Sequence, residues 1–94
     1  MPEASPSLQA ERARRIEALL RERLDATDVV VVDESHLHHG HAGAQGGAGH
    51  FRVTVVSPRF AGLSLVAAQR LVYEAVAEMM GADIHALAIT TKAP

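Results

Sequence analysis

Histidine is the one residue type in this chain of 94 residues that is both over-represented and able to do chemistry. The sequence contains six histidines and no cysteine. Four of the six lie between residues 36 and 41, and the other two are His50 and His85. A neutral imidazole is a common ligand for transition metals, and it changes charge near neutral pH. Metal binding is therefore the chemistry that these side chains are suited to carry.

The absence of cysteine limits that chemistry. The chain can form no disulfide, offers no thiolate nucleophile and cannot build a cysteine-ligated zinc or iron–sulfur site alone. If it handles a thiophilic metal, another molecule must bring the sulfur. Neither a phosphate-binding loop nor a Ser-His-acid pattern is evident, so we expect no enzyme. A metallohydrolase would need Asp33 or Glu34 beside the histidines, and the glycine-rich stretch there is too mobile to hold one in place.

Length and composition indicate one small domain. Hydrophobic residues make up 48% of the chain, but few are aromatic, so Val, Leu, Ile and Met must build the core. The net charge of −2 gives no reason to expect a polyanion as partner. No apolar run approaches the roughly 18–20 residues that span a bilayer, so we expect no membrane partner. The first residues lack the basic and apolar pattern of a targeting signal, and we expect a cytoplasmic protein.

The first half of the chain predicts a helix, a strand and a loop. Apolar residues recur at helical spacing from about Ser7 to Leu24, after a Ser5-Pro6 pair suited to a helix start. Residues 29–32 are four valines, which predict a strand buried on at least part of both faces. Residues 35–49 hold five glycines and no apolar period, which predicts a long mobile loop.

The second half predicts a strand, a helix and a strand. In the strand from His50 to Val56, Phe51, Val53 and Val55 share one face. Ser64 can cap a helix whose predicted buried stripe is Leu65, Leu71, Val72, Ala75, Val76 and Met79, and Gly81 suits a left-handed C-terminal cap. Ile84 to Thr90 alternates, with Ile84, Ala86 and Ala88 on one face and His85, Leu87 and Ile89 on the other.

This order predicts a two-layer α+β domain over residues 1–94, with residues 1–6 and 91–94 flexible. Two helices can cover one face of a three-stranded mixed sheet. The first two strands, joined by a loop, are expected to be antiparallel. The last two, joined through a helix, are expected to be parallel with a right-handed crossover.

Several segments, in this order and spacing, resemble the BolA-like family. They are Val32-Asp33-Glu34-Ser35-His36, His50-Phe51-Arg52-Val53-Thr54-Val55-Val56-Ser57, Arg59-Phe60-Ala61-Gly62-Leu63-Ser64, Arg70-Leu71-Val72 and His85-Ala86-Leu87-Ala88-Ile89. Together they cover nearly everything after the first helix. The resemblance implies a fold like the type II KH domain, in agreement with the predicted order of elements.

The resemblance also implies a function. Members of the family form heterodimers with monothiol glutaredoxins around a bridging 2Fe–2S cluster, to which the partner and its bound glutathione each supply sulfur. The histidine of the family's His-Ala-Leu motif, here His85, supplies another ligand. The last comes from the loop between the first two strands. Counting back from His50-Phe51 places that ligand at His41, with His39 and His38 as alternatives.

The remaining histidines receive a plainer interpretation. His36, His38 and His39 are expected to be solvated or to bind metals adventitiously. His50 could approach the edge of a cluster, but an exposed strand residue is the favoured interpretation. Imidazole ligands titrate near neutral pH, so a cluster held by them should be labile and suited to transfer or sensing. A loop ligand could leave while the strand ligand stays.

A second function remains open, because the KH-like fold binds single-stranded nucleic acid and some family members are described as transcriptional regulators. Where many relatives carry a basic Arg-His-Arg stretch, this chain has Ala68-Gln69-Arg70. No Gly-x-x-Gly clamp is evident, which makes nucleic acid the less favoured partner. Self-association of the unbound chain is also left open.

Overall fold

The computed structural model describes residues 7–35 and 47–94, and within them the predicted order of elements is confirmed. The elements are α1 (Leu8–Leu24), β1 (Asp28–Asp33), β2 (Gly49–Val56), the 3₁₀ turn η2 (Pro58–Phe60), α3 (Leu65–Ala75), the 3₁₀ turn η3 (Ala77–Met79) and β3 (Ile84–Lys92). The predicted loop falls mostly outside the described residues. So do four of the six histidines, at positions 36, 38, 39 and 41.

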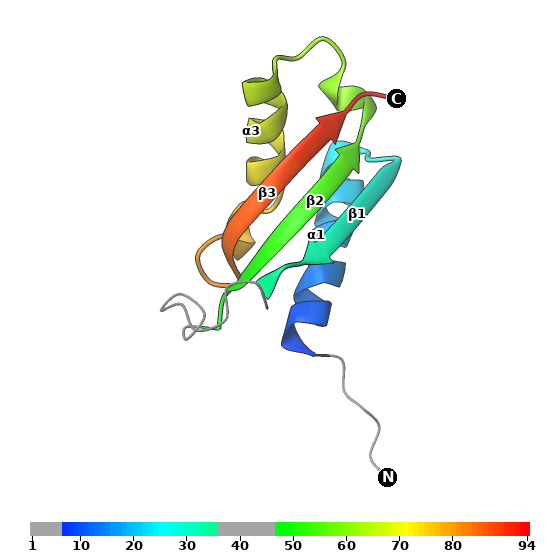
Figure 1. The fold of residues 1–94 in the computed structure, drawn as a ribbon. Helices are drawn as coiled ribbons and strands as arrows, with labels where there is room; N and C mark the ends of the chain where they lie inside the picture. Colours follow the sequence, from blue (N-terminus) through cyan, green and yellow to red (C-terminus); the bar gives the residue numbers. More distant parts are fainter. Residues whose placement is uncertain (1–6, 36–46) are drawn as a thin grey trace.

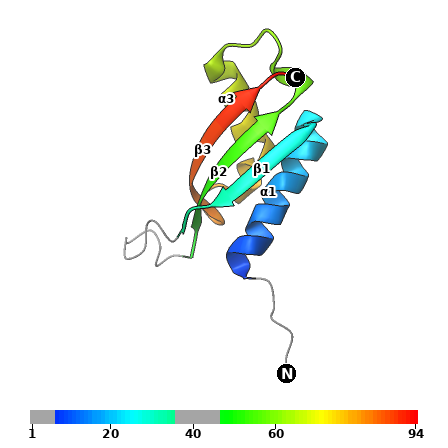
Figure 2. The same cartoon turned by 45° about the vertical axis from the view of Figure 1, so that its right-hand side comes forward.

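The three strands form one sheet in the order β1-β2-β3. The β1 and β2 strands are antiparallel and β2 and β3 are parallel, as predicted. Both helices lie on the same side of this sheet, which gives the two-layer α+β architecture (Figures 1 and 2). The core between the layers is built from aliphatic residues and two phenylalanines: Ile16, Leu19, Leu20, Leu24, Val29, Phe51, Val53, Val55, Phe60, Ala68, Val72, Ala75, Val76, Met79, Ile84 and Leu87.

The other face of the sheet, which we call the open face, corrects one prediction about β1. Val29 is buried, but Val30 and Val32 are 49% and 45% exposed. The expectation that this strand is partly buried on both faces was wrong. The reason is that both helices cover one face, and no helix in the described part of the chain covers the other. In β2 the alternation is as predicted, with Phe51, Val53 and Val55 in the core.

At the start of each helix, a serine side chain accepts a hydrogen bond from a backbone amide of the first turn. Ser7, and not Ser5, caps α1, since its hydroxyl accepts a hydrogen bond from the amide of Ala10 at 2.9 Å. Ser64 caps α3 as predicted. Leu65, predicted to be in the buried stripe, is 64% exposed, and the stripe begins one turn later at Ala68.

The C-terminal strand is held on both edges. It extends to Lys92, because Thr91 and Lys92 pair with Val55 and Val56, so the strand includes two residues of the segment 91–94 that was predicted to be flexible. On its outer edge, the carbonyl oxygen of Leu87 accepts a hydrogen bond from the Tyr73 hydroxyl at 3.3 Å. Likewise, the Ile89 carbonyl accepts one from the Gln69 amide at 3.5 Å. Side chains of α3 thereby occupy backbone acceptors of an edge strand.

Candidate histidine site

His85 occupies an irregularity at the start of β3. Gly49 of β2 pairs with Ile84, but the next residue, His50, pairs with Ala86. One step along β2 therefore corresponds to two steps along β3, and His85 is the additional residue. Such a β-bulge turns a side chain away from the regular direction of the strand, and bulges are frequent beside functional sites. The side chain of His85 is exposed.

The bulge corrects the predicted faces of this strand. Ile84 and Leu87 are both buried although they are three residues apart, and Ala86 between them is exposed. Ile84 and Ala86 therefore do not share a face, because the additional residue shifts the alternation by one position. Beyond the bulge, Leu87 and Ile89 pack against the core as one face.

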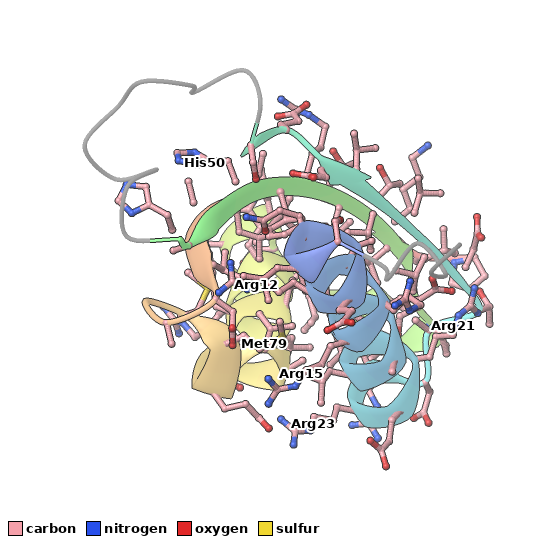
Figure 3. All side chains as sticks on the ribbon, turned by 90° about the horizontal axis from the view of Figure 1, so that it is seen from below. Arg12, Arg15, Arg21, Arg23, His50 and Met79 are labelled. Atoms are coloured by element: carbon pink, nitrogen blue, oxygen red, sulfur yellow. The ribbon has the colours of Figure 1, made fainter. Side chains whose placement is uncertain are left out.

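The bulge brings together two histidines that lie far apart in the sequence. The ring centroids of His50 and His85 are 4.9 Å apart, and their planes are inclined at 52°. The His50 side chain projects from the sheet on the side away from the helices (Figure 3). It is only 9% exposed, so the favoured interpretation of His50 as an exposed strand residue was wrong. The two form a pair in which one imidazole is packed and the other is accessible.

The backbone of His50 is tied to the end of β1. Its amide donates to the Ser35 hydroxyl at 3.0 Å, and its carbonyl accepts from the amide of Glu34 at 2.8 Å. The Asp33 carboxylate in turn accepts a hydrogen bond from the Ser35 amide at 2.9 Å. The chain therefore leaves β1 beside His50. Since His41 lies outside the described residues, its predicted role as a ligand stays a prediction.

A groove of about 460 Å³ adjoins the pair on the open face. Its lining includes His50, Ala86, Ala88 and the ion pair between Glu34 and Arg52, whose Oε2 and Nε atoms are 2.9 Å apart. The hydrogen bond to Glu34, together with its charge, raises the pKa of Arg52. Small alanine side chains leave room beside the histidines, and the paired charges form a polar wall.

The histidine pair is not a complete metal site by itself. Across residues 7–35 and 47–94, no three His, Cys, Asp or Glu side chains are grouped closely enough to hold a metal ion. A metal at this position would need ligands in addition to the two described imidazoles, and stable sites for thiophilic metals commonly use four. Within the same residues, no helix is both long and apolar enough to cross a membrane.

Comparison with known proteins identifies the family to which this fold belongs. A sequence profile of the family described as BolA-like protein matches residues 20–94. The chain belongs to the BolA-like family. The BolA domain of SufE1 from Arabidopsis thaliana has a solved structure that superimposes on this chain with a TM-score of 0.76 at 35% identity, covering 88% of this chain and 92% of that one.

Two BolA-like relatives bear informative names. The chain is 40% identical over 86 residues to Protein BOLA1, chloroplastic, of Arabidopsis thaliana, covering 88% of this chain and 54% of that protein. It is 43% identical over 76 residues to the DNA-binding transcriptional regulator BolA of Vibrio cholerae, covering 81% and 69%. The chain thus spans about half the length of the plant relative. Since that relative is a chloroplast protein, the expected cytoplasmic location stays a prediction.

Proposed function

We propose that this BolA-like chain is an adaptor that binds a monothiol glutaredoxin and supplies His85 as a ligand to a bridging, labile 2Fe–2S cluster. The observation that carries the proposal is the position of His85. Its imidazole is exposed at a bulge, on a strand that the sheet holds in place, beside a second imidazole. An exposed ligand on rigid backbone can reach a group that is held partly by another protein.

The available donors fit such a shared group. Imidazole can replace two of the four thiolates that normally hold a 2Fe–2S cluster, and the bound cluster supplies reversible one-electron chemistry. The chain has no cysteine, so thiolate ligands must come from elsewhere, here from the glutaredoxin and its glutathione. This chain's own contribution is then to orient the imidazole of His85 and to cover one side of that ring with His50.

The second ligand is proposed to be His41, with His39 and His38 as alternatives. His41 follows Ser35 by six residues, and an extended chain covers at most about 3.6 Å per residue, so the covalent reach from Ser35 is roughly 20 Å. The Ser35 hydroxyl accepts a hydrogen bond from the amide of His50. Chain length therefore permits His41 to approach the histidine pair. His50 itself is a further alternative, because its ring already lies beside His85.

The test is reconstitution of the complex from purified proteins with iron, sulfide and glutathione. Wild-type protein should give a heterodimer whose visible absorption and circular dichroism differ from those of the glutaredoxin alone. The variants are single His→Ala substitutions at His36, His38, His39, His41, His50 and His85. His85→Ala should shorten the lifetime of the cluster most, and His41→Ala should follow, whereas His36→Ala serves as the matched control.

Three results would count against all or part of the proposal. If His85→Ala left both the spectrum and the cluster lifetime unchanged, His85 would not be a ligand. If no heterodimer formed with the wild-type chain under any ratio of components, the partner would be wrong. A complex that forms without iron but never acquires a new spectrum would support the proposed partner and contradict the proposed cluster.

Nucleic-acid binding is a second candidate, favoured by the name of the Vibrio cholerae relative. A second groove, of about 490 Å³, is lined by Arg59, Arg70, Leu63 and neighbouring residues. Arg59 is already paired with Asp25 at 2.9 Å, which leaves Arg70 as the main cation there. Phosphate binding by so few charges should be weak and sensitive to salt. A gel shift with labelled DNA at two salt concentrations, comparing wild type with Arg70→Gln, tests this candidate.

A further inference from the structure

Arg12 is an almost buried arginine that joins the two segments leading into the histidine pair. It lies in the second turn of α1, and its side chain is only 11% exposed. Its Nε atom lies 3.1 Å from Oδ1 of Asp83, and its Nη1 atom donates a hydrogen bond to the carbonyl oxygen of Gly47. Figure 3 shows Arg12 between α1 and the chain that leads into β3.

The partners of Arg12 lie just ahead of the two histidines. Gly47 precedes His50 by three residues, and Asp83 precedes His85 by two. The two segments are also joined directly, because the Gly49 amide donates to the Asp83 carbonyl at 2.9 Å. One guanidinium group thus binds the start of β2 and the start of β3 at the place where the bulge forms.

The same region is packed closely against α1. A Cβ atom added at Gly49 would lie 2.5 Å from Oε1 of Gln9 and 2.7 Å from the ring of Phe51. The Gln9 amide also donates to the Gly47 carbonyl, at 3.4 Å. The first two turns of α1 therefore hold the backbone in place where residues 47–49 meet Asp83, which we call the corner. Arg12 supplies the charged contact there.

Arginine has the shape that this position requires. Its planar group can donate to a carboxylate and to a carbonyl at the same time, which the single ammonium of lysine does less well. A nearly buried charge that loses a partner is costly, so the interaction should restrict the geometry more than an exposed ion pair does. Arg15, on the same helix, offers the comparison. It also approaches Asp83, at 3.5 Å, but its side chain is 53% exposed.

We propose that Arg12 is a positioning residue that sets the relative placement of His50 and His85 by clamping Gly47 and Asp83 together. This proposal rests on the proposed function only in assigning a use to the histidine pair. The placement itself is a property of the isolated chain, and it can be measured without a glutaredoxin or iron.

The experiment compares Arg12→Gln and Arg12→Lys with the control Arg15→Gln by NMR on the isolated full chain. Two readouts report on the corner. One is the nuclear Overhauser effect between the ring protons of His50 and His85, and the other is hydrogen exchange at the Gly49 amide. Exchange at the amide of Val53, in the middle of the core strand β2, shows whether each variant is folded.

Arg12→Gln should lose most of the ring-to-ring effect and should exchange the Gly49 amide at least about tenfold faster, with Val53 still protected. Arg12→Lys should recover only part of the loss, and Arg15→Gln should behave as wild type. If Arg12→Lys and Arg12→Gln kept both readouts at wild-type values, or if Arg15→Gln changed them equally, the proposal would be overturned. Should Arg12→Gln fail to fold, the lysine variant and Asp83→Asn decide the matter. Failure of cluster assembly with glutaredoxin would leave these measurements unaffected.

Discussion

The imidazole of His85 lies against that of His50 although the sheet pairs His50 with Ala86. A regular parallel register would have aligned each residue of β3 with one residue of β2. The additional residue in β3 instead places a histidine where it contacts a neighbour on the adjacent strand. The accessible imidazole is thereby supported by a packed one, and both start from backbone held by α1 and by the end of β1.

Removal of the packed ring should loosen the accessible one. His50→Ala is expected to destabilise the fold by about 1–3 kcal/mol, because it truncates a side chain that is only 9% exposed. It should also broaden the range of His85 orientations. Urea unfolding measures the first effect, and the chemical shifts of the His85 ring measure the second. Unchanged His85 shifts in the variant would show that the contact between the rings has no consequence in solution.

Gly49 should tolerate no side chain. Gly49→Ala would place a Cβ atom 2.7 and 3.0 Å from two atoms of the Phe51 ring, and Phe51 is packed in the core at 1% exposure. Overpacking of this kind costs about 1–3 kcal/mol. The nearest contact, at 2.5 Å, is the flexible end of Gln9, so the double variant Gly49→Ala with Gln9→Ala should recover only part of the loss. Thermal unfolding of the three proteins distinguishes these outcomes, and full recovery would mean that Phe51 adjusts freely.

Ser57 should be the most sensitive serine in the described chain. Its side chain is fully buried, donates to the Leu24 carbonyl and accepts from the amide of Arg59 at 3.0 Å. Ser57→Ala leaves both backbone groups without this partner, at an expected cost of about 1–3 kcal/mol. Ser64→Ala removes a cap at the exposed start of α3 and should cost roughly 1 kcal/mol. Denaturant titration of both variants tests the order, and an equal or larger loss for Ser64 would contradict it.

Acid should weaken one contact between α1 and the turn η3, the ion pair of Arg23 and Glu78. The hydrogen bond from Arg23 holds the pKa of Glu78 below its ordinary value, and the charges of Arg23 and Arg15 act in the same direction. A carboxyl group with a lowered folded-state pKa stabilises the protein above its unfolded pKa of about 4.3, and the benefit disappears as the pH falls through the folded value. Glu78→Gln should therefore lower the Tm at pH 7 and lower it by less at pH 3. A loss of the same size at both pH values would assign the effect to packing.

The regular parts of this fold could be predicted from the sequence because their patterns are local. Alternation of Phe51, Val53 and Val55 with polar residues determined both the strand and its buried face. The hydroxyl of Ser64 ahead of an apolar stripe determined the start of α3. The order of the elements then left one plausible two-layer arrangement, which the structure confirms.

The site was harder to predict, because it depends on pairings between distant segments. The stretch from Ile84 to Thr90 alternates without interruption in the sequence, and only its pairing with β2 reveals the additional residue. The burial of His50 likewise comes from contacts between segments that lie far apart in the chain, among them the ring of His85. Arg12 resembles every other charged residue of an amphipathic helix, and its role depends on Gly47 and Asp83, which lie 35 and 71 residues away. For the start of α1, the sequence offers a serine at position 5 and another at position 7, and only the structure shows that Ser7 is the N-cap.

The hydrogen bonds from Tyr73 and Gln69 to the carbonyls of Leu87 and Ile89 affect how another protein can approach. A bare edge strand invites a foreign strand to extend the sheet, which leads to uncontrolled aggregation as readily as to specific docking. Here two acceptors along that margin are already engaged by a helix of the same chain. A protein that approached His85 would therefore meet resistance to strand addition along β3 and would have to arrive over the open face or past the end of the sheet.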